Sequence, residues 1–280
     1  MTISINNSTT LLMTRQVMER LNGDLQKNFQ RLASGVRVNS ASDGGSAVAV
    51  AMRMAAQVSG TSVAKQNAND AMSLLQVADA ALRETANALQ KVRDLAVDAT
   101  TSTKSANDRA ASLAEVKQLV SEISRLATDT SVFGQKPLRG AFTATVQVDA
   151  EAGRAMTMAI AGASLQLLDL GRSGSKLNVS TAGSASAAIG VADAALNSVA
   201  QMRAALGGMQ SRLSSIVSSL DSLSLAYTGA RSRIMDTDMA AETADMTRNS
   251  IRQQASIAVM AQANMQSQSL LKLLNAGGGA

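Results

Sequence analysis

The sequence predicts a mainly α-helical fold: an elongated antiparallel helical bundle or coiled coil, with a small β-hairpin and with paired N- and C-terminal helices. Three observations support this fold class. Apolar residues recur at alternating steps of three and four over long stretches. The 280 residues include a single proline, Pro137, so only glycine clusters interrupt the helical pattern elsewhere. Three Phe and one Tyr are the only aromatic residues, which suits thin helical layers better than a thick globular core.

The first expected element is an amphipathic helix over residues 11–32. Its apolar face is formed by Met18, Leu21, Leu25, Phe29 and Leu32. The run Asp43-Gly44-Gly45 follows this helix. It has neither the three-glycine spacing nor the lysine of a phosphate-binding loop, so we interpret it as a turn.

Two further helices are predicted over residues 64–99 and 113–127. The first carries a seam rich in small residues: Ala64, Ala68, Ala71, Leu75, Ala78, Leu82, Thr85, Leu89, Val92, Ala96 and Ala99. The seam of the second is Leu113, Val116, Val120, Ile123 and Ala127. The polar stretch 100–108 is the expected turn between them, and Asn107 or Asp108 is the expected N-cap of the second helix.

Residues 142–160 change to a period of two, which predicts one β-hairpin. Phe142, Ala144, Val146 and Val148 share one face, and the glycine-containing stretch 149–154 turns the chain back. The Gly- and Ser-rich stretch 171–186 is predicted to be an exposed loop.

The longest seam lies in the C-terminal half and has no skip. Its positions are Ala192, Ala195, Val199, Met202, Leu206, Met209, Leu213, Ile216, Leu220, Leu223, Tyr227, Ala230 and Ile234. A helix of this length spans roughly 64 Å at 1.5 Å per residue. Within it we interpret Gly207-Gly208 as a point of close helix approach. The three seams can be buried only against one another, which gives the predicted bundle.

The run ARSRIMDTDMAAETADM, residues 230–246, combines two arginines with four acids. The acids are Asp236, Asp238, Glu242 and Asp245. Hard cations take carboxylate oxygens, but the run lacks a loop glycine, calcium-loop spacing and a neighbouring nucleophile. We interpret it as a joint in which Arg231 and Arg233 end one helix. Asp236 or Asp238 then caps the next helix.

The C-terminal arm, residues 241–274, is a further expected helix with Ile251, Ala255 and Val259 on its apolar face. It ends in a leucine-rich segment that includes Leu270 and Leu273. Residues 253–271 carry no charge, but recurring Gln, Ser and Asn make a membrane span costly. We therefore expect an uncharged helix that is covered within an assembly.

Composition excludes several classes of function. The chain has no His and no Cys, so the commonest general base, the commonest metal ligand and any disulfide are missing. We expect no enzymatic activity, no cofactor and no metal. The net charge is +5, but Lys and Arg alternate with acids, which is typical of a solvated helix face rather than a nucleic-acid-binding surface. The N-terminal segment MTISINNSTTLLMTR has neither the basic nor the apolar region of a secretory signal.

The chain resembles bacterial flagellin, the subunit of the flagellar filament, from end to end. QRLASGVRVNSASD (30–43) is similar to the N-terminal signature of that family, and NANDAMSLLQVADAAL and LQKVRDLAV are similar to its long central helix. ARSRIMDTDMAAETADM is similar to its C-terminal signature, and QQASIAVMAQAN follows as the family's terminal helix does. These motifs are long and stand in the family's order.

The resemblance implies a domain organisation. Residues 1–44 and 236–280 would form the inner-core domain, D0, in which the terminal helices pair. The apolar residues of the two arms would then be inner-core assembly residues. Residues 45–235 would form D1, the bundle with its hairpin. Longer flagellins carry outer domains where this chain has only the 171–186 loop, so the resemblance is to a short form.

The resemblance also implies a function, partners and a location. The chain would be a structural subunit that polymerises into the helical flagellar filament for swimming motility. It would be exported unfolded by the flagellar type III apparatus, without a cleaved signal peptide, and be extracellular. Its partners would be itself, the export chaperone, and the cap and junction proteins, with no nucleic acid and no membrane.

Many flagellins carry a LQRVREL segment that an innate immune toll-like receptor recognises. Here the segment is LQKVRDL, so Leu89, Gln90 and Arg93 correspond, as does Glu115 on the following helix. Lys91 stands in place of the central arginine, and an ammonium does not reproduce the planar fork of a guanidinium. The resemblance therefore leaves recognition by this receptor open.

Three alternatives are weighed against a filament subunit. A hook–filament junction protein has a similar terminal design, but the central and C-terminal signatures favour flagellin. A basic coiled-coil nucleic-acid-binding protein would bind DNA with a steep salt dependence. A hydrolase that uses the acids of residues 236–245 would lose activity on Asp-to-Asn changes there.

Overall fold

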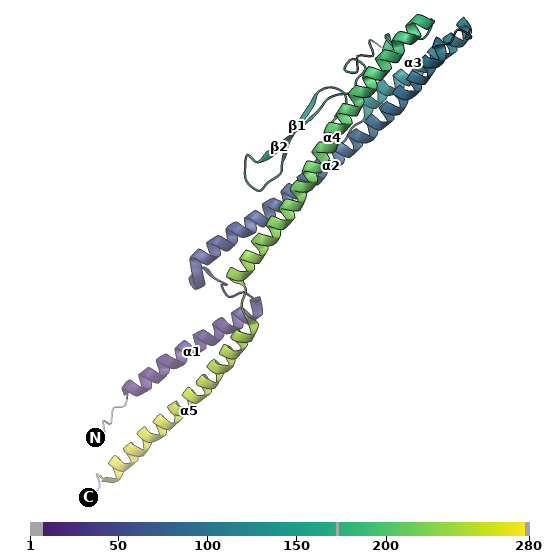
Figure 1. Cartoon of the computed structure of the whole chain (residues 1–280). Coiled ribbons are helices and arrows are strands. Elements are labelled where there is room, and N and C mark those ends of the chain that lie inside the picture. The colour runs from purple at the N-terminus through teal and green to yellow at the C-terminus, as the bar shows by residue number, and fades with distance from the viewer. Residues whose placement is uncertain (1–7, 172–173, 278–280) are drawn as a thin grey trace. The chain divides into compact units, whose positions relative to one another are not determined.

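The computed structural model describes residues 8–171 and 174–277 (Figure 1). It divides into two compact units. The terminal unit comprises Met1–Ala55 and Tyr227–Ala280, and the central unit comprises Ala56–Ala226. The divisions fall inside two long helices, α2 (Ala41–Thr100) and α4 (Ala182–Met235). The domains that the resemblance implies, residues 1–44 with 236–280 and residues 45–235, have boundaries nearer to the ends of these helices.

The terminal unit is built mainly on α1 (Ser8–Ser34) and α5 (Met239–Gly277), which lie side by side (Figure 1). Gly35, at φ 71°, ends α1, and its N–H donates to the Arg31 carbonyl at 2.8 Å. Gly44 interrupts the first turn of α2 with non-helical dihedral angles, at the expected turn. No described helix is long and apolar enough to cross a bilayer.

The central unit is a bundle of α2, α3 (Ala106–Asp129) and α4, with a two-stranded sheet beside it (Figure 1). Every seam position of α2 from Ala64 to Ala99 is buried, and so are Val116, Val120, Ile123 and Ala127 of α3. On α4 the fully buried members of the seam are Ala192, Ala195, Val199, Leu206, Leu213 and Leu220. Ile216 is half-buried and packs against this core. The predicted fold class, a helical bundle with a small hairpin, is confirmed.

The start of α3 differs from the prediction. Its N-cap is Ser105 rather than Asn107 or Asp108. The Ser105 hydroxyl accepts from the Asp108 N–H at 3.2 Å, and the Asp108 carboxylate accepts from the Ser105 N–H at 3.0 Å. Each side chain thus satisfies a backbone donor of the other, as in a capping box. The pKa of Asp108 lies below its ordinary value because the Ser105 backbone and hydroxyl donate to the ionised form.

The hairpin consists of β1 (Phe142–Gln147) and β2 (Ala155–Ile160), antiparallel, with Phe142 opposite Ile160. Met156, Met158 and Ile160 are buried against the bundle. The turn of the hairpin packs on α2 at Gly60, where an added Cβ would come within 2.6 Å of the Ala150 Cβ. A glycine is required there because any side chain would displace the turn.

The prediction of an exposed loop over residues 171–186 is wrong in two respects. Helix α4 begins at Ala182, so the last residues of the segment are helical. Thr181 and Ser184 cap this helix through reciprocal side-chain-to-backbone hydrogen bonds. Leu177 and Val179 are buried, with at most 1 % of their surface exposed. These two apolar side chains fix the segment to the core, although glycine and serine dominate its composition.

The Gly207-Gly208 pair also differs from the prediction. A Cβ added at either residue would meet nothing within 4 Å. Among the described residues, therefore, no other helix packs closely against this pair.

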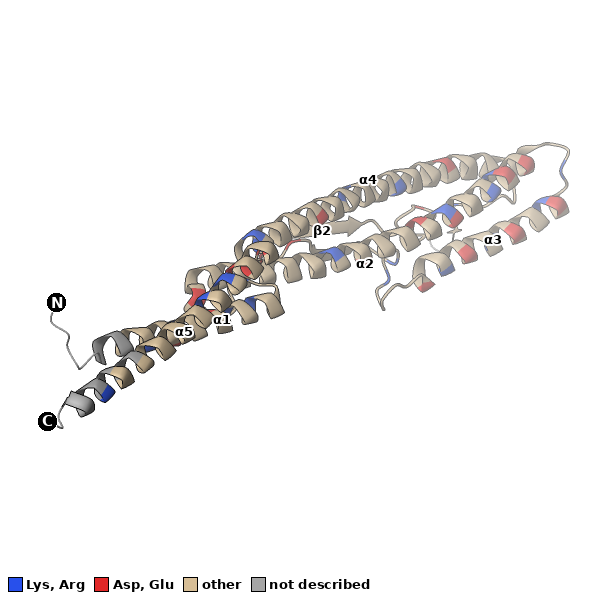
Figure 2. Ribbon diagram, turned by 90° about the horizontal axis from the view of Figure 1, so that it is seen from below, with Lys and Arg blue, Asp and Glu red and all other residues tan. Residues whose placement is uncertain are grey.

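Charged residues of both signs are scattered along α2, α3 and α4 (Figure 2). Three ion pairs join α2 to α4: Lys65–Asp221 at 2.6 Å, Arg93–Asp193 at 2.7 Å and Arg203–Asp79 at 2.8 Å. Exposed pairs of this kind contribute little stability individually, because water and salt screen them. They occur in the register that the buried seams of α2 and α4 set.

Replacing Leu213 by Ala is expected to destabilise the central unit by about 2–5 kcal/mol, because a fully buried leucine leaves a cavity behind. Ile216→Ala should cost less, because Ile216 is only half-buried. Ser215→Ala is the control, since its hydroxyl is exposed and bonds only to the Ser211 carbonyl of its own helix. The measurement is the thermal midpoint of the monomer. A midpoint unchanged by Leu213→Ala would contradict this packing.

The stability contributed by Asp79 is expected to depend on pH. The Arg203 guanidinium that donates to this carboxylate holds the pKa of Asp79 below its ordinary value. Its contribution is therefore complete above about pH 3.9, the pKa in the unfolded chain, and is lost as pH falls through the lower folded pKa. After discounting for solvent screening we expect at most about 1 kcal/mol. The difference in thermal midpoint between wild type and Asp79→Asn should be clear at pH 7 and shrink progressively as pH falls below about 3.9, and a constant difference would exclude this linkage.

Candidate functional site

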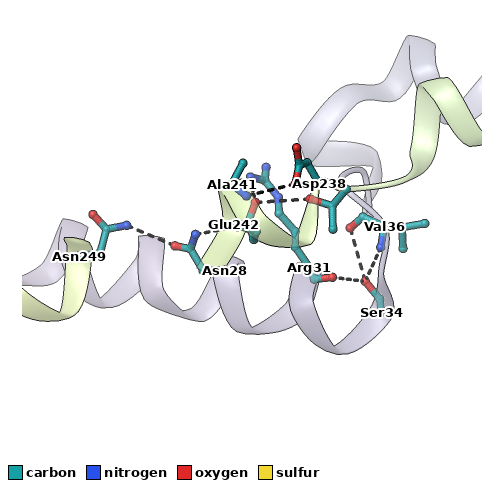
Figure 3. A network of polar contacts seen from close by, with 9 residues as sticks. Asn28, Arg31, Ser34, Val36, Asp238, Ala241, Glu242 and Asn249 are labelled. Carbon is teal, nitrogen blue, oxygen red and sulfur yellow. Dashed lines mark hydrogen bonds and ion pairs between the residues drawn. The ribbon is translucent and has the colours of Figure 1, made fainter. Parts of the chain in front are cut away.

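Asn28 and Glu242 form a buried polar contact between α1 and α5. Both are nearly inaccessible, at 6 % and 7 % exposure. The Asn28 side-chain amide donates to Glu242 Oε1 at 2.6 Å and accepts from the Asn249 amide at 3.3 Å (Figure 3). Arg31 lies 3.8 Å from Glu242 Oε2. A buried carboxylate is tolerated only with such partners, so this network specifies how the two terminal helices pair.

The connections after α1 and after α4 pair with each other. Val36 and Asp236 form an isolated antiparallel bridge. The Arg37 N–H donates to the Met235 carbonyl at 2.6 Å, and the Arg37 guanidinium donates to the Ile234 carbonyl at 2.8 Å. The Thr237 N–H in turn donates to the Gly35 carbonyl at 3.1 Å. These bonds hold the end of α1 and the end of α4 together within the terminal unit.

The joint lies between the end of α4 at Met235 and the start of α5 at Met239. Asp238, rather than Asp236, caps α5: its carboxylate accepts from the Ala240 and Ala241 N–H groups at 2.9 and 3.2 Å. The Asp236 carboxylate instead accepts from the Ser232 hydroxyl. Arg231 and Arg233 are exposed near the end of α4, where cations favour the helix dipole.

The acids of the joint point to different partners. Asp238 faces the first N–H groups of α5, Glu242 faces Asn28, and Asp245 pairs with Arg248 at 3.1 Å. Within residues 8–171 and 174–277, no group of three or more potential ligands is placed to hold a metal ion. The arrangement is that of a helix start and a helix pair.

The apolar residues predicted for the two arms fall into two groups. Leu21 is buried, and Met18, Leu25 and Leu32 are half-buried. Phe29, Ile251 and Val259 are instead exposed, at 61 %, 62 % and 57 %. The side chains of Leu270 and Leu273 lie outside the described residues.

Other large apolar side chains of the terminal unit are exposed as well. They are Leu12, Met13, Val17, Met52, Met239, Ile257 and Met265. Together with Phe29, Ile251 and Val259 we call these side chains the exposed apolar face of the terminal unit. Where exposed apolar side chains adjoin one another, they mark interaction sites.

Asn28 is the functional residue that sequence reasoning missed. The spacing Leu21, Leu25, Asn28, Leu32 continues the alternation of four and three, whereas Phe29 breaks it. A polar residue at a seam position specifies pairing at some cost in stability. The seam position of Asn28 could therefore have predicted that Asn28 lies between the two helices and that Phe29 lies outside their interface.

Comparison with known proteins identifies the family of the chain. Residues 5–143 match the family described as bacterial flagellin N-terminal helical region, and residues 189–274 match the bacterial flagellin C-terminal helical region. Flagellin FlaB2 of Treponema pallidum (strain Nichols) is 34% identical over 284 residues, which cover 96% of this chain and 99% of that protein. The chain belongs to the flagellin family. It is a structural subunit of a flagellar filament.

Two further similarities concern this flagellin. The flagellin of Bacillus subtilis (strain 168) is 33% identical, with 96% of this chain and 99% of that protein covered. Among solved structures, a protein assigned as a flagellar hook-associated protein of Vibrio parahaemolyticus superposes with a TM-score of 0.60 at 15% identity. That match covers 69% of this chain and 100% of the other, and it shows a shared fold alone.

The segment of this flagellin that is similar to the receptor-binding motif lies on α2. Gln90 and Lys91 are exposed, as is Glu115 on α3. Arg93 is half-buried and pairs with Asp193 of α4. Leu89 is fully buried in the bundle core.

Proposed function

We propose that this flagellin polymerises head to tail into a helical tube, and that neighbouring copies cover the exposed apolar face of its terminal unit. That face is the observation that supports the proposal, because burial of apolar surface is the main driving force for association. A contact between two different faces of identical subunits continues into an open helical polymer when successive rotations do not close into a ring. The terminal unit would then be the inner-core domain D0, and the bundle D1.

Folding and assembly are coupled in this proposal. A helix with large apolar residues in water gains little from local propensity and depends on packing. α5 has Ile251, Ile257 and Val259 exposed, and α1 has Phe29 exposed, so each helix is only partly covered by the other. The subunit stays soluble until its arms meet neighbours at the growing end.

Other partners are proposed to contact the terminal unit or the ends of the polymer. An export chaperone would cover the C-terminal arm before assembly, and the cap and junction proteins would contact the two ends of the polymer. The location is extracellular, in a filament that serves swimming motility, and the role is structural rather than enzymatic. For the innate receptor, the exposed Gln90, Lys91 and Glu115 are the residues proposed to be accessible.

The test is to raise the ammonium sulfate concentration over the purified full-length chain and to inspect the pellet by negative-stain microscopy. We expect long filaments of uniform width, and circular dichroism should show that helix content increases as they form. Amorphous aggregate or short closed assemblies would contradict the proposal. Short assemblies without growth would instead favour a junction protein, the alternative with similar terminal design.

A further inference from the structure

Phe133 occupies an unusual turn between α3 and β1. Val132 and Gln135 exchange two backbone hydrogen bonds of 2.9 Å each, which closes a two-residue turn. Both central residues have positive φ, 51° at Phe133 and 76° at Gly134. Turns with this backbone favour Asn-Gly, and a bulky residue at positive φ is strained.

The strain at Phe133 is not offset by burial within the chain. Its side chain is 70 % exposed, at the edge of a groove between β1 and α2. Strained backbone conformations cluster at functional sites, which makes Phe133 a candidate for one. Aromatic residues are enriched in contact surfaces, so the exposed ring points to a contact with another molecule.

A second, apolar groove lies at the other edge of the hairpin, between the end of β2 and α4. It has a volume of about 430 Å³, and its lining includes Ile160, Leu167, Met202 and Leu206. Its lining contains no charged residue, and Leu167 on its rim is 54 % exposed. Pockets for small organic ligands occupy roughly 300–1,000 Å³, so this groove has room for one aromatic ring.

We propose that Phe133 of one subunit inserts into the groove between β2 and α4 of a second copy of this chain. This inference rests on the proposed function, because the occupant is a neighbouring subunit in the polymer. The projecting ring stands at the α2 side of the hairpin and the receiving groove at the α4 side. A contact between two different surfaces does not close as a two-fold dimer does, and it propagates into an open polymer when successive rotations do not close into a ring.

One pair of opposite charges is compatible with the same pairing. Asp70 is the one charged residue in the lining of the groove beside Phe133, and Lys136 is exposed next to Gln135 of that lining. Arg139 is exposed two residues before Ala141, which lines the receiving groove. In the proposed contact we expect Asp70 of one subunit to face Arg139 of the next. Such rim charges orient association more than they strengthen it.

The first test uses Phe133→Asn, which should make the monomer more stable and polymerisation less favourable. Asn accepts positive φ, so the thermal midpoint of the monomer should rise by about 2–4 °C. The critical concentration for polymerisation should rise about tenfold or more, because the buried ring is lost. Phe133→Tyr keeps the ring and should polymerise nearly as wild type does. If Phe133→Asn polymerised at the wild-type concentration, the insertion would be excluded.

The second test locates the groove and exploits the absence of cysteine from the chain. Gln135→Cys lies beside the ring, and Gln201→Cys lies in the lining of the groove, so Phe133 itself is retained. The two variants are mixed, polymerised and treated with a short bismaleimide. We expect covalent dimers of one subunit of each kind, and none when Ser215→Cys on the exposed face of α4 replaces Gln201→Cys. Filaments that form without the 135–201 cross-link would overturn this inference, whereas absence of wild-type filaments would overturn the proposed function.

Discussion

Deleting residues 241–280 is expected to abolish polymerisation and to leave the central unit folded. The deletion removes nearly all of α5, and with it the partners of Asn28 and Asn22 on α1. Leu21, buried in the intact chain, becomes uncovered. Since helices in proteins depend mainly on tertiary packing, α1 alone should not stay ordered in water. The central unit, residues 56–226, keeps every seam residue it needs.

Microscopy under salting-out conditions shows whether the truncated chain polymerises, and circular dichroism measures the helix content that it retains or gains. The full-length chain should gain helix as it forms filaments, and the truncated chain should stay soluble, remain partly helical and gain none. Deletion of residues 278–280, which follow α5, is the matched control and should leave assembly unchanged. Ordered filaments from the truncated chain would show that pairing of the terminal helices is not required.

Replacing Asn28 by Leu is expected to weaken the assembled filament strongly. The Glu242 carboxylate would lose its 2.6 Å hydrogen bond while it stayed buried. Its remaining side-chain partners among the described residues are Arg31 at 3.8 Å and Thr237 at 3.5 Å. A buried charged group that loses a donor costs about 2–3 kcal/mol per subunit. The temperature at which filaments depolymerise should fall clearly.

The companion variant carries Asn28→Leu together with Glu242→Leu. Replacing both partners of a buried polar pair by apolar groups is often neutral, so the double variant should recover much of the lost depolymerisation temperature. Asn22→Leu is the control, because its amide contact to Gln253 is exposed. If the double variant were less stable than Asn28→Leu, Glu242 would stabilise the pairing through contacts other than Asn28.

The bundle could be predicted because the buried residues of a long helix recur at regular spacings along the sequence. The α2 seam is buried from Ala64 to Ala99, and its positions follow from this spacing without knowledge of the packing partner. The joint could also be predicted, because a helix cap depends on residues that are neighbours in sequence. Where the sequence offered two candidates close together, as with Asp236 and Asp238, only the structure distinguished the capping residue.

The features that escaped prediction depend on contacts distant in sequence or on a composition that conceals packing. Asn28 and Glu242 are separated by 214 positions, so nothing local states that they meet. Leu177 and Val179 lie in a glycine- and serine-rich stretch whose composition predicts exposure, yet both are buried. Phe29 was assigned to the helix pair because it is apolar, although the seam spacing pointed to its polar neighbour.

The glycine pair Gly207-Gly208 in α4, against which no other described element packs, affects how the helix bends. Each glycine inside a helix costs about 1 kcal/mol relative to alanine, and Gly207 and Gly208 touch nothing that would require them. Gly and Ser pairs are among the recognised causes of kinks in helices. We therefore expect α4 to bend more readily at this glycine pair than a helix without glycine, while the buried Leu206 and Leu213 on either side hold it to the core. Bending of this subunit under load should concentrate over those few residues.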